Sequence, residues 1–364
     1  MNKGLYVHIP FCIRKCKYCD FISFTSCEYE AYVDALCKEL DMYKGEKIDT
    51  VFIGGGTPTI LPLNLIEKLF VHINNTFSLS NDTEWTVEAN PKTVDSEKLN
   101  MMRSLGVNRI SLGVQSFNDA ELTRIGRVHT AKEAKETISL IARYFDNFNI
   151  DIISALPEQS QESFLRTLDI ATSFDPTHIS CYSLILEEGT PLFDEHRIKP
   201  LNIPDEETER EMYQDAVMLL DSKGYKQYEI SNFAKDGYEC RHNLKYWNTS
   251  DYIGVGIAAH GLLKGVRYEN TSDLKSYING DFCCEKTVLT EEDKIAEYII
   301  MTLRLRSGLN TNEFRNRFNK DFYSEYKMQI ERFISLGLLE KTVSGFRLTD
   351  EGISLSNTVL CEFV

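Results

Sequence analysis

Near its start the chain reads Tyr6-Val-His-Ile-Pro-Phe-Cys12-Ile-Arg-Lys-Cys16-Lys-Tyr-Cys19. The three cysteines are spaced as C-x3-C-x2-C and follow a short apolar run, residues 5–9, that is typical of a strand. Thiolates that converge from one short loop are the usual ligands of cubane iron–sulfur clusters. We therefore predict a [4Fe–4S] cluster on Cys12, Cys16 and Cys19, with one iron left open to a small bidentate ligand.

A zinc site is the alternative for these cysteines. Structural zinc sites prefer four protein ligands, usually supplied by paired C-x2-C elements. No second pair lies nearby, and the next cysteine, Cys27, is eight residues beyond Cys19. The spacing therefore favours the cluster, and the iron content of the purified protein distinguishes the two.

The first half of the chain alternates short apolar runs with segments of helical periodicity. The predicted strands span residues 5–9, 50–53, 84–88, 109–114, 148–153 and 178–184. The predicted helices between them span residues 29–43, 63–77, 95–105, 131–144 and 161–174. Such regular succession is typical of parallel βα repeats. We predict an α/β fold: a partial, open TIM-type barrel of six βα units, with its chemistry at the carboxyl ends of the strands.

Beyond residue 201 the pattern changes. It predicts a helix over 205–223, a strand over 225–233, and irregular, Gly-rich stretches over 241–247 and 254–261. From residue 290 it predicts helices over 291–305, 309–317 and 324–336 and then a hairpin over 339–348. Helices followed by a hairpin resemble a winged-helix module. We expect three parts, residues 1–200, 201–285 and 286–364, with the last serving as a protein contact or a lid.

The composition limits the partners. The chain has 40 Lys and Arg residues against 55 Asp and Glu residues, a net charge of −15. Such an acidic chain disfavours non-specific binding to nucleic acid or anionic lipid. The N-terminus carries no apolar signal segment, and no run of 18 apolar residues occurs, so we expect neither secretion nor stable membrane insertion. The expected location is the cytoplasm, where thiols stay reduced.

The cysteine motif, with Tyr18 before its last cysteine, resembles that of the radical S-adenosylmethionine (SAM) superfamily. The block from Tyr6 to Cys12 is similar to the subgroup that contains the oxygen-independent coproporphyrinogen III oxidase HemN and the haem chaperone HemW. The resemblance extends over essentially the whole chain, to residues 348–352. It implies that SAM binds the open iron and that reduction of the cluster cleaves SAM to a 5′-deoxyadenosyl radical.

Several strand ends carry residues that this resemblance assigns to SAM. The turn Gly54-Gly55-Gly56-Thr57 exposes backbone groups to a ligand. By resemblance, the contacts of SAM are Tyr6, Gly55, Gly56, Thr57, Glu88, Gln115, Arg127 and Asp151. His8 is either a buried structural histidine or a hydrogen-bond donor near the cluster. No residue is assigned a catalytic role.

Two features separate the oxidase from the chaperone. Oxidases of the HemN type carry a further cysteine two residues after the third ligand, where this chain has Phe21. They also have an arm of several tens of residues before the cluster, whereas this chain reaches Cys12 almost at once. Both departures argue against decarboxylase activity and favour a haem chaperone.

The segment His242-Asn243-Leu-Lys-Tyr246-Trp247 resembles the HNxxYW motif of these chaperones. We expect His242 to bind haem, with the aromatic rings against the porphyrin; a buried capping histidine beside two core aromatics is the plainer interpretation. The predicted function is a haem chaperone that binds haem, a [4Fe–4S] cluster and SAM and passes haem to an acceptor, such as a haem-less membrane respiratory oxidase. The alternative is an oxygen-independent coproporphyrinogen III oxidase.

Overall fold

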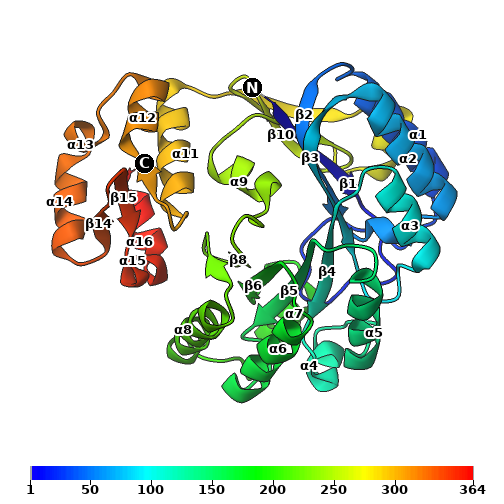
Figure 1. Cartoon of the computed structure of the whole chain (residues 1–364), viewed down its shortest axis with the longest axis horizontal. Coiled ribbons are helices and arrows are strands. Elements are labelled where there is room, and N and C mark those ends of the chain that lie inside the picture. Colours follow the sequence, from blue (N-terminus) through cyan, green and yellow to red (C-terminus); the bar gives the residue numbers. More distant parts are fainter. Residues whose placement is uncertain (1, 364) are drawn as a thin grey trace.

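One large sheet organises the computed structural model, which describes residues 2–363 (Figure 1). Six strands follow one another along the chain: β1 (Lys3–Ile9), β2 (Lys47–Gly55), β3 (Ser78–Ala89), β4 (Arg109–Gln115), β5 (Phe148–Ser154) and β6 (His178–Ser183). Each pairs in parallel with the next. The predicted partial barrel of six βα units is confirmed, because both outer edges of the sheet stay unpaired within residues 2–363.

Helices lie between successive strands. They are α1 (Tyr29–Asp41), α2 (Leu63–Thr76), α3 (Ser96–Ser104), α4 (Asp119–Arg124), α5 (Ala131–Ile141) and α6 (Gln161–Ser173), with a 3-10 turn at Pro58–Ile60. Local side-chain caps fix the starts of α3 to α6; Thr130 and Glu133, for example, form a capping box at α5. The sequence did not predict α4 or α7 (Pro191–Ile198), because helices of about two turns show too little periodicity.

The strands of the barrel form the main core together with these helices. All residues of β4, from Arg109 to Gln115, are buried. A parallel strand covered by helices on one side and by the barrel interior on the other has no solvent face. Polar residues at its inward positions therefore have to find partners inside the barrel.

The sheet continues beyond the barrel at both ends. β9 (Tyr252–Val255) pairs in parallel with β1, and the antiparallel strands β10 (His260–Leu263), β11 (Val266–Asn270) and β12 (Cys283–Val288) follow it. At the other end lie β8 (Asn232–Ala234) and β7 (Lys226–Gln227). The expectation of an irregular 254–261 segment was therefore wrong at both its ends, which belong to β9 and β10. The predicted strand over 225–233 is two short strands instead.

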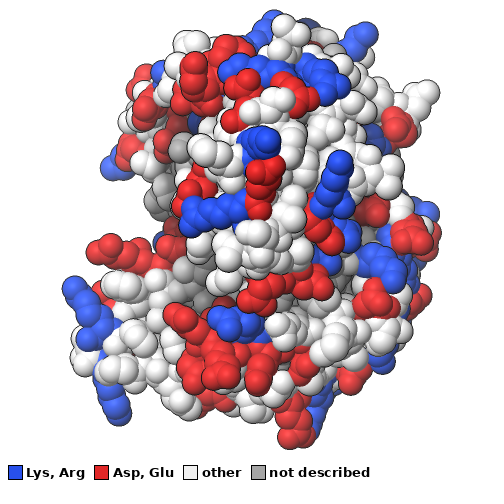
Figure 2. Space-filling model, turned by 90° about the vertical axis from the view of Figure 1, so that its left-hand side faces the viewer, with Lys and Arg blue, Asp and Glu red and all other residues white. Residues whose placement is uncertain are grey.

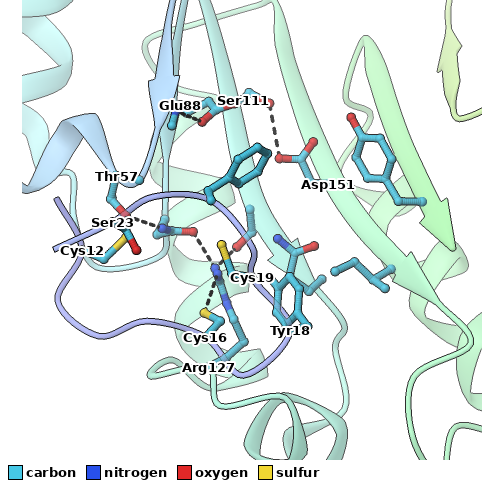
Figure 3. Close-up of a pocket in the computed structure, with 18 of the residues that line it drawn as sticks. Cys12, Cys16, Tyr18, Cys19, Ser23, Thr57, Glu88, Ser111, Arg127 and Asp151 are labelled. Atoms are coloured by element: carbon cyan, nitrogen blue, oxygen red, sulfur yellow. Dashed lines mark hydrogen bonds between the residues drawn. The ribbon is translucent and has the colours of Figure 1, made fainter. Parts of the chain in front are cut away.

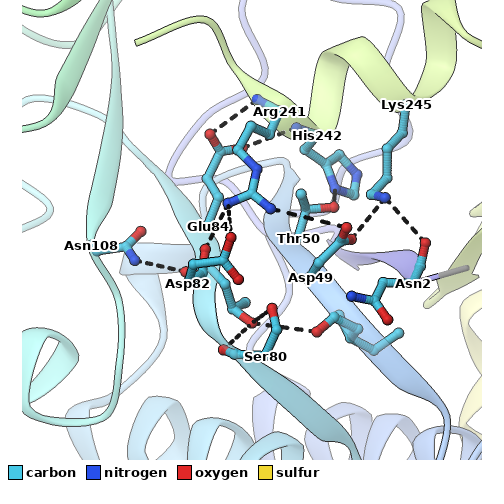
Figure 4. Close-up of polar contacts among 12 residues, drawn as sticks. Asn2, Asp49, Thr50, Ser80, Asp82, Glu84, Asn108, Arg241, His242 and Lys245 are labelled. Carbon is cyan, nitrogen blue, oxygen red and sulfur yellow. Dashed lines mark hydrogen bonds and ion pairs between the residues drawn. The ribbon is translucent and has the colours of Figure 1, made fainter. Parts of the chain in front are cut away.

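Residues 241–247 form a helix, α9 (Arg241–Trp247), and not the irregular stretch that was expected. Glu84, on β3, makes this helix possible. Its carboxylate accepts the backbone N–H groups of Arg241 at 3.0 Å and His242 at 2.9 Å (Figure 4). Unsatisfied N–H groups at a helix start are a cost that such a cap removes. Since the capping residue lies on a strand far away in the sequence, the residues around 241 contain no local signal for the start of a helix.

Two further helices, α8 (Glu206–Ser222) and α10 (Leu274–Asn279), precede the helical C-terminal part. That part contains α11 (Glu291–Leu303), α12 (Thr311–Phe318), α13 (Phe322–Glu325), α14 (Lys327–Ser335), α15 (Asp350–Ser354), α16 (Ser356–Leu360) and a 3-10 turn at Cys361–Phe363. Its small sheet has the order β13 (Leu309–Asn310), β15 (Gly345–Leu348), β14 (Leu339–Lys341). A core of its own includes Phe314, Phe322 and Phe346. Helices followed by a hairpin occur as predicted, and β13 is the addition.

One face of the molecule is mixed in charge. On the face seen in Figure 2, Lys and Arg side chains stand among Asp and Glu side chains and do not gather into a basic field. Between residues 2 and 363, no helix has both the length and the apolar character needed to cross a bilayer.

Candidate functional site

A cavity of about 550 Å³ opens toward the carboxyl ends of the barrel strands (Figure 3). Its size falls in the range of small-molecule sites, roughly 300–1,000 Å³. Most of the predicted site residues line it: Cys12, Cys16, Cys19, Gly55, Gly56, Thr57, Glu88, Gln115, Arg127 and Asp151. Two of the predicted residues, Tyr6 and His242, lie outside its lining.

The loop that follows β1 carries the three cysteines of the motif into this cavity. Its base is closed by a backbone hydrogen bond from the N–H of Cys12 to the carbonyl of Phe24, at 3.0 Å. Its middle is tied to the barrel by a similar bond from Lys17 to Ile125, also at 3.0 Å. These bonds hold a loop without regular secondary structure against one wall of the cavity.

The cysteine sulfur atoms face different neighbours. Sγ of Cys12 lies 3.7 Å from Oγ1 of Thr57, and Sγ of Cys16 accepts a hydrogen bond from Nη1 of Arg127 at 3.6 Å. Burial raises the pKa of the Cys12 thiol, and it raises the pKa of Cys19 to about 11. These two thiols are therefore protonated at neutral pH when no metal is bound, and binding a metal centre releases their protons.

This arrangement suits a cluster better than a single ion. In residues 2–363, no three His, Cys, Asp or Glu side chains converge on a position for one metal ion. A tetrahedral zinc site needs its donors within roughly 2.0–2.3 Å of the ion. A [4Fe–4S] cluster is a larger body that thiolates bind at separate irons. Three free thiols from one loop, all open to one cavity, fit that larger group.

The Gly-rich turn after β2 forms the wall beside Cys12. Gly55 has a φ of +106°, in the left-handed region that favours glycine, and a Cβ there would lie 2.5 Å from the His8 ring. A Cβ at Gly56 would lie 2.7 Å from the carbonyl oxygen of Phe11. Both positions therefore require glycine, since the turn packs directly against β1 and its loop.

Two carboxyl groups, Glu88 and Asp151, face the cavity from β3 and β5 (Figure 3). Burial, with a further contribution from Asp151, raises the pKa of Glu88 to about 8. Burial also raises the pKa of Asp151, whose carboxylate accepts hydrogen bonds from Asn149 at 2.6 Å and Ser111 at 3.4 Å. Such a pair attracts a cationic ligand, because a positive charge between the two groups relieves their mutual repulsion.

Gln115 and Arg127 complete the wall near the cluster loop. Gln115 ends β4 with a φ of +72°, and its side-chain oxygen is buried with no partner among residues 2–363. Arg127 reaches under the loop, where Nη2 donates to Oδ1 of Asn90 at 2.5 Å and to the carbonyl of Gly113. The arginine thus joins the ends of β3 and β4 to the Cys16 sulfur.

Tyr6 acts behind the cavity wall. Its hydroxyl lies 3.0 Å from Nδ1 of His8, and Nε2 of that histidine lies 3.3 Å from the carbonyl of Ile22. Since a carbonyl only accepts, Nε2 carries the proton and Nδ1 accepts from Tyr6. Burial lowers the pKa of His8 to about 4, so the ring is neutral. The pair links β1 to the end of the cluster loop.

His242 is fully buried under the barrel (Figure 4). Nδ1 lies 2.9 Å from Oγ1 of Thr50, Nε2 lies 2.9 Å from the hydroxyl of Tyr246, and the ring stacks on Phe52 at 5.3 Å. Burial lowers the pKa of His242 to about 3. In this arrangement the imidazole offers no free nitrogen to an iron, so the geometry favours the buried structural interpretation over a haem ligand.

Its neighbour Asn243 lines the cavity, which the sequence did not indicate. Also missed were further lining residues on the barrel strands: Arg109, Ser111, Asn149 and Ser180. For β4 the sequence does contain a signal. Side chains alternate between the two faces of a strand, so residues 109, 111, 113 and 115 are expected on the same face, and all four line the cavity.

Comparison with known proteins agrees with this geometry. Residues 6–171 match the Radical SAM superfamily, and residues 289–355 match the HemN C-terminal domain. The chain is 36% identical to a protein named heme chaperone HemW from Bacillus subtilis, covering 100% of this chain and 99% of that protein. It is 34% identical to a protein of the same name from Escherichia coli, covering 98% and 97%.

Among solved structures, coproporphyrinogen III oxidase (HemN) from Escherichia coli superimposes with a TM-score of 0.87 and 24% sequence identity. The match covers 100% of this chain and 90% of the oxidase. At this identity the likeness establishes a shared fold and not a shared reaction.

Proposed function

Because this chain belongs to the radical SAM superfamily and, within it, to the HemW family of haem chaperones, we propose that it binds haem beside a [4Fe–4S] cluster and SAM and transfers the haem to an acceptor protein. The observation that carries the proposal is that the cluster loop and the strand ends of the barrel line the same cavity. In barrels of this type ligands bind at that edge.

The proposed roles follow from position. Cys12, Cys16 and Cys19 hold the cluster. The turn Gly55-Gly56-Thr57 would offer backbone groups to the amino group of SAM. Glu88, Gln115, Arg127 and Asp151 surround the rest of SAM, and Tyr6 supports the site from behind through His8.

The residues of the chain orient the bound groups. When bound, the cluster and SAM supply reductive cleavage of the sulfonium bond. Arg127 holds Cys16 in place by donating to its sulfur, as a partner behind a metal ligand does. Asn149 and Ser111 hold Asp151 toward the cavity. Oε2 of Glu88 accepts a hydrogen bond from the N–H of Gly55 at 3.0 Å, which holds the carboxyl group against the Gly-rich turn.

Phe21 favours the chaperone over the oxidase. Its side chain is 59% exposed and lines the cavity where an oxidase of the HemN type carries a further cysteine. A large apolar ring at the mouth suits contact with a flat apolar ligand. The acceptor we propose is a haem-less membrane respiratory oxidase, and the C-terminal part of this chain is the surface that we propose to contact it.

The test uses the full chain with its cluster reconstituted anaerobically. Haem is titrated in and followed by its absorbance, and the loaded protein is then mixed with a haem-free respiratory oxidase. We expect saturable haem binding and recovery of oxidase activity at a rate above that with free haem. A parallel assay adds coproporphyrinogen III, SAM and a reductant. Formation of protoporphyrinogen, or failure to bind haem, would overturn the proposal.

A further inference from the structure

Arg109 lies at the start of β4, on the floor of the cavity and remote from the cluster loop. Arg109 is 2% exposed, and an arginine guanidinium stays charged in proteins. Nε is buried without a hydrogen-bond partner among residues 2–363, and Nη1 makes one long contact, 3.5 Å to Oγ1 of Thr86. Buried arginines almost always have their donors satisfied, because an unpaired buried charge is costly.

Nearby carboxylates leave this guanidinium unpaired. Within residues 2–363, none of the ion pairs of up to 4.0 Å involves Arg109. Glu84 is committed to the N-terminus of α9, where it accepts from Arg241 and His242. Asp151 is held by Asn149 and Ser111. The floor of the cavity therefore carries guanidinium N–H donors of Arg109 that have no hydrogen-bond acceptor among residues 2–363.

Asn243 reaches the same cavity from α9. It adjoins His242, whose ring turns the other way and bonds Thr50 on β2. On this helix His242 therefore holds the helix against β2, while Asn243 lines the cavity. Asn243 and Arg109 thus line one cavity, and an amide donor together with a charged guanidinium is a combination that suits an anionic oxygen.

The mouth of the cavity has the opposite character. Phe21, Tyr182 and Ile185 line it and are 59%, 42% and 64% exposed. Arg109 and Gln115 are six positions apart along β4, which at about 3.3 Å per residue places the floor roughly 20 Å below the strand end. Apolar side chains therefore line the outer end of the cavity, and Arg109 lies at its inner end, with the carboxyl groups of Glu88 and Asp151 also in the lining.

We propose that Arg109 and Asn243 form a carboxylate-binding subsite that receives a propionate group of haem, while Phe21, Tyr182 and Ile185 contact the macrocycle. Haem has this polarity, since its ring is apolar and its two carboxylates lie on one edge. The carboxylate of SAM is a separate group, because it belongs at the cluster end. The inference rests on the proposed haem binding and adds the orientation of the ligand and the residues that set it.

The test compares haem with haem dimethyl ester, in which both propionates are blocked, on the cluster-loaded full chain in one detergent buffer. A charge-assisted hydrogen bond in a buried site corresponds to about 10- to 100-fold in affinity. We expect wild type to prefer haem over the ester by that factor, and R109Q to bind the two alike. N243L should reduce the preference about three- to tenfold. R267Q, which removes an arginine paired with Glu297 outside the cavity, is the matched control and should keep it.

The outcomes separate the two proposals. Equal affinity of wild type for haem and its ester overturns the subsite and leaves haem binding intact. A preference that R109Q and N243L both retain also overturns it. Binding of neither ligand by wild type overturns both proposals. If R109Q fails to take up the cluster and SAM, the wild-type comparison and N243L decide the matter.

Discussion

Oγ1 of Thr50 lies 2.9 Å from Nδ1 of His242, which joins the second strand of the barrel to the helix that closes its floor. The other ring nitrogen, Nε2, bonds Tyr246 on the same helix at 2.9 Å. We expect His242→Ala to lower the free energy of unfolding by about 2–4 kcal/mol, because it removes two buried hydrogen bonds and the packing on Phe52. Denaturant unfolding measures this loss.

The same variant shows whether His242 has a structural role or binds the haem iron. We expect cluster-loaded H242A to keep the wild-type haem spectrum, since the ring has no free nitrogen for iron. His260→Ala, at a histidine whose side chain is 56% exposed on β10, is the matched control and should leave stability unchanged. A haem spectrum altered in H242A alone would restore the axial-ligand hypothesis.

The second prediction concerns the pH dependence of SAM binding. Burial and Asp151 raise the pKa of Glu88 to about 8, so the carboxyl is mostly protonated at pH 7 before the ligand arrives. A cationic ligand favours the ionised form and lowers this pKa in the complex. SAM affinity should therefore rise with pH up to about 8 and weaken up to about tenfold per pH unit below it.

Calorimetry in buffers of different ionisation enthalpy measures the proton that Glu88 releases on SAM binding. Glu88→Gln should bind SAM more weakly and with a flat pH profile. Glu187→Gln, at an exposed carboxylate at the mouth of the same cavity, should behave like wild type. A profile in E88Q that still rises toward pH 8 would assign the proton to another group.

The third prediction concerns the cluster. Cys19→Ser should lose bound iron and the visible iron–sulfur absorbance after anaerobic reconstitution, and its SAM affinity should fall at least about tenfold, because SAM needs the open iron. Cys27→Ser, at an exposed cysteine beyond the motif, should load like wild type. Iron content and absorbance check both variants. Equal iron in C19S and wild type contradicts the assignment.

The fourth prediction concerns the contact between the C-terminal part and α9. Arg317, on α12, donates to the carbonyls of Asn248 at 3.0 Å and Thr249 at 2.8 Å, and its guanidinium lies 5.1 Å from the Tyr298 ring centroid. Arg317→Ala should lower the free energy of unfolding by about 1–3 kcal/mol and speed amide hydrogen exchange in residues 248–250. Arg315→Ala, on the same helix and paired with Asp321, should not change that exchange. Identical exchange in R317A and wild type would show that the contact contributes nothing.

The barrel was predictable because its information is local. Each strand and helix of the six units carries its own period of apolar residues, and the caps, such as Ser160 at α6, are local too. Helix α9 was not predictable, since its cap is Glu84 from β3. Strands β9 and β10 were missed for a related reason: they are short and Gly-rich, and the pairing with β1 stabilises β9.

The part of the candidate site at the strand ends was also predictable from the sequence, whereas its floor was not. Residues at the strand ends, such as Glu88 and Asp151, line the cavity that the barrel implies. Arg109 escaped prediction because a strand start in an open barrel looks like any buried position until the helix beneath it is placed. His242 shows the reverse, since the motif was recognisable but the direction of its ring depends on Thr50 and Tyr246.

The pairing of β1 with β9 has a consequence for the order in which the protein is made. The strand that leads into the cysteines lies between β2 and residues 252–255. A ribosome that adds about 5–20 residues per second needs roughly 10–50 s to reach β9 after β1. Until then β1 is an edge strand and the site is unfinished. The strand that carries the cysteine loop therefore gains its second neighbour only after residues 252–255 have been made, about two thirds of the way along the chain.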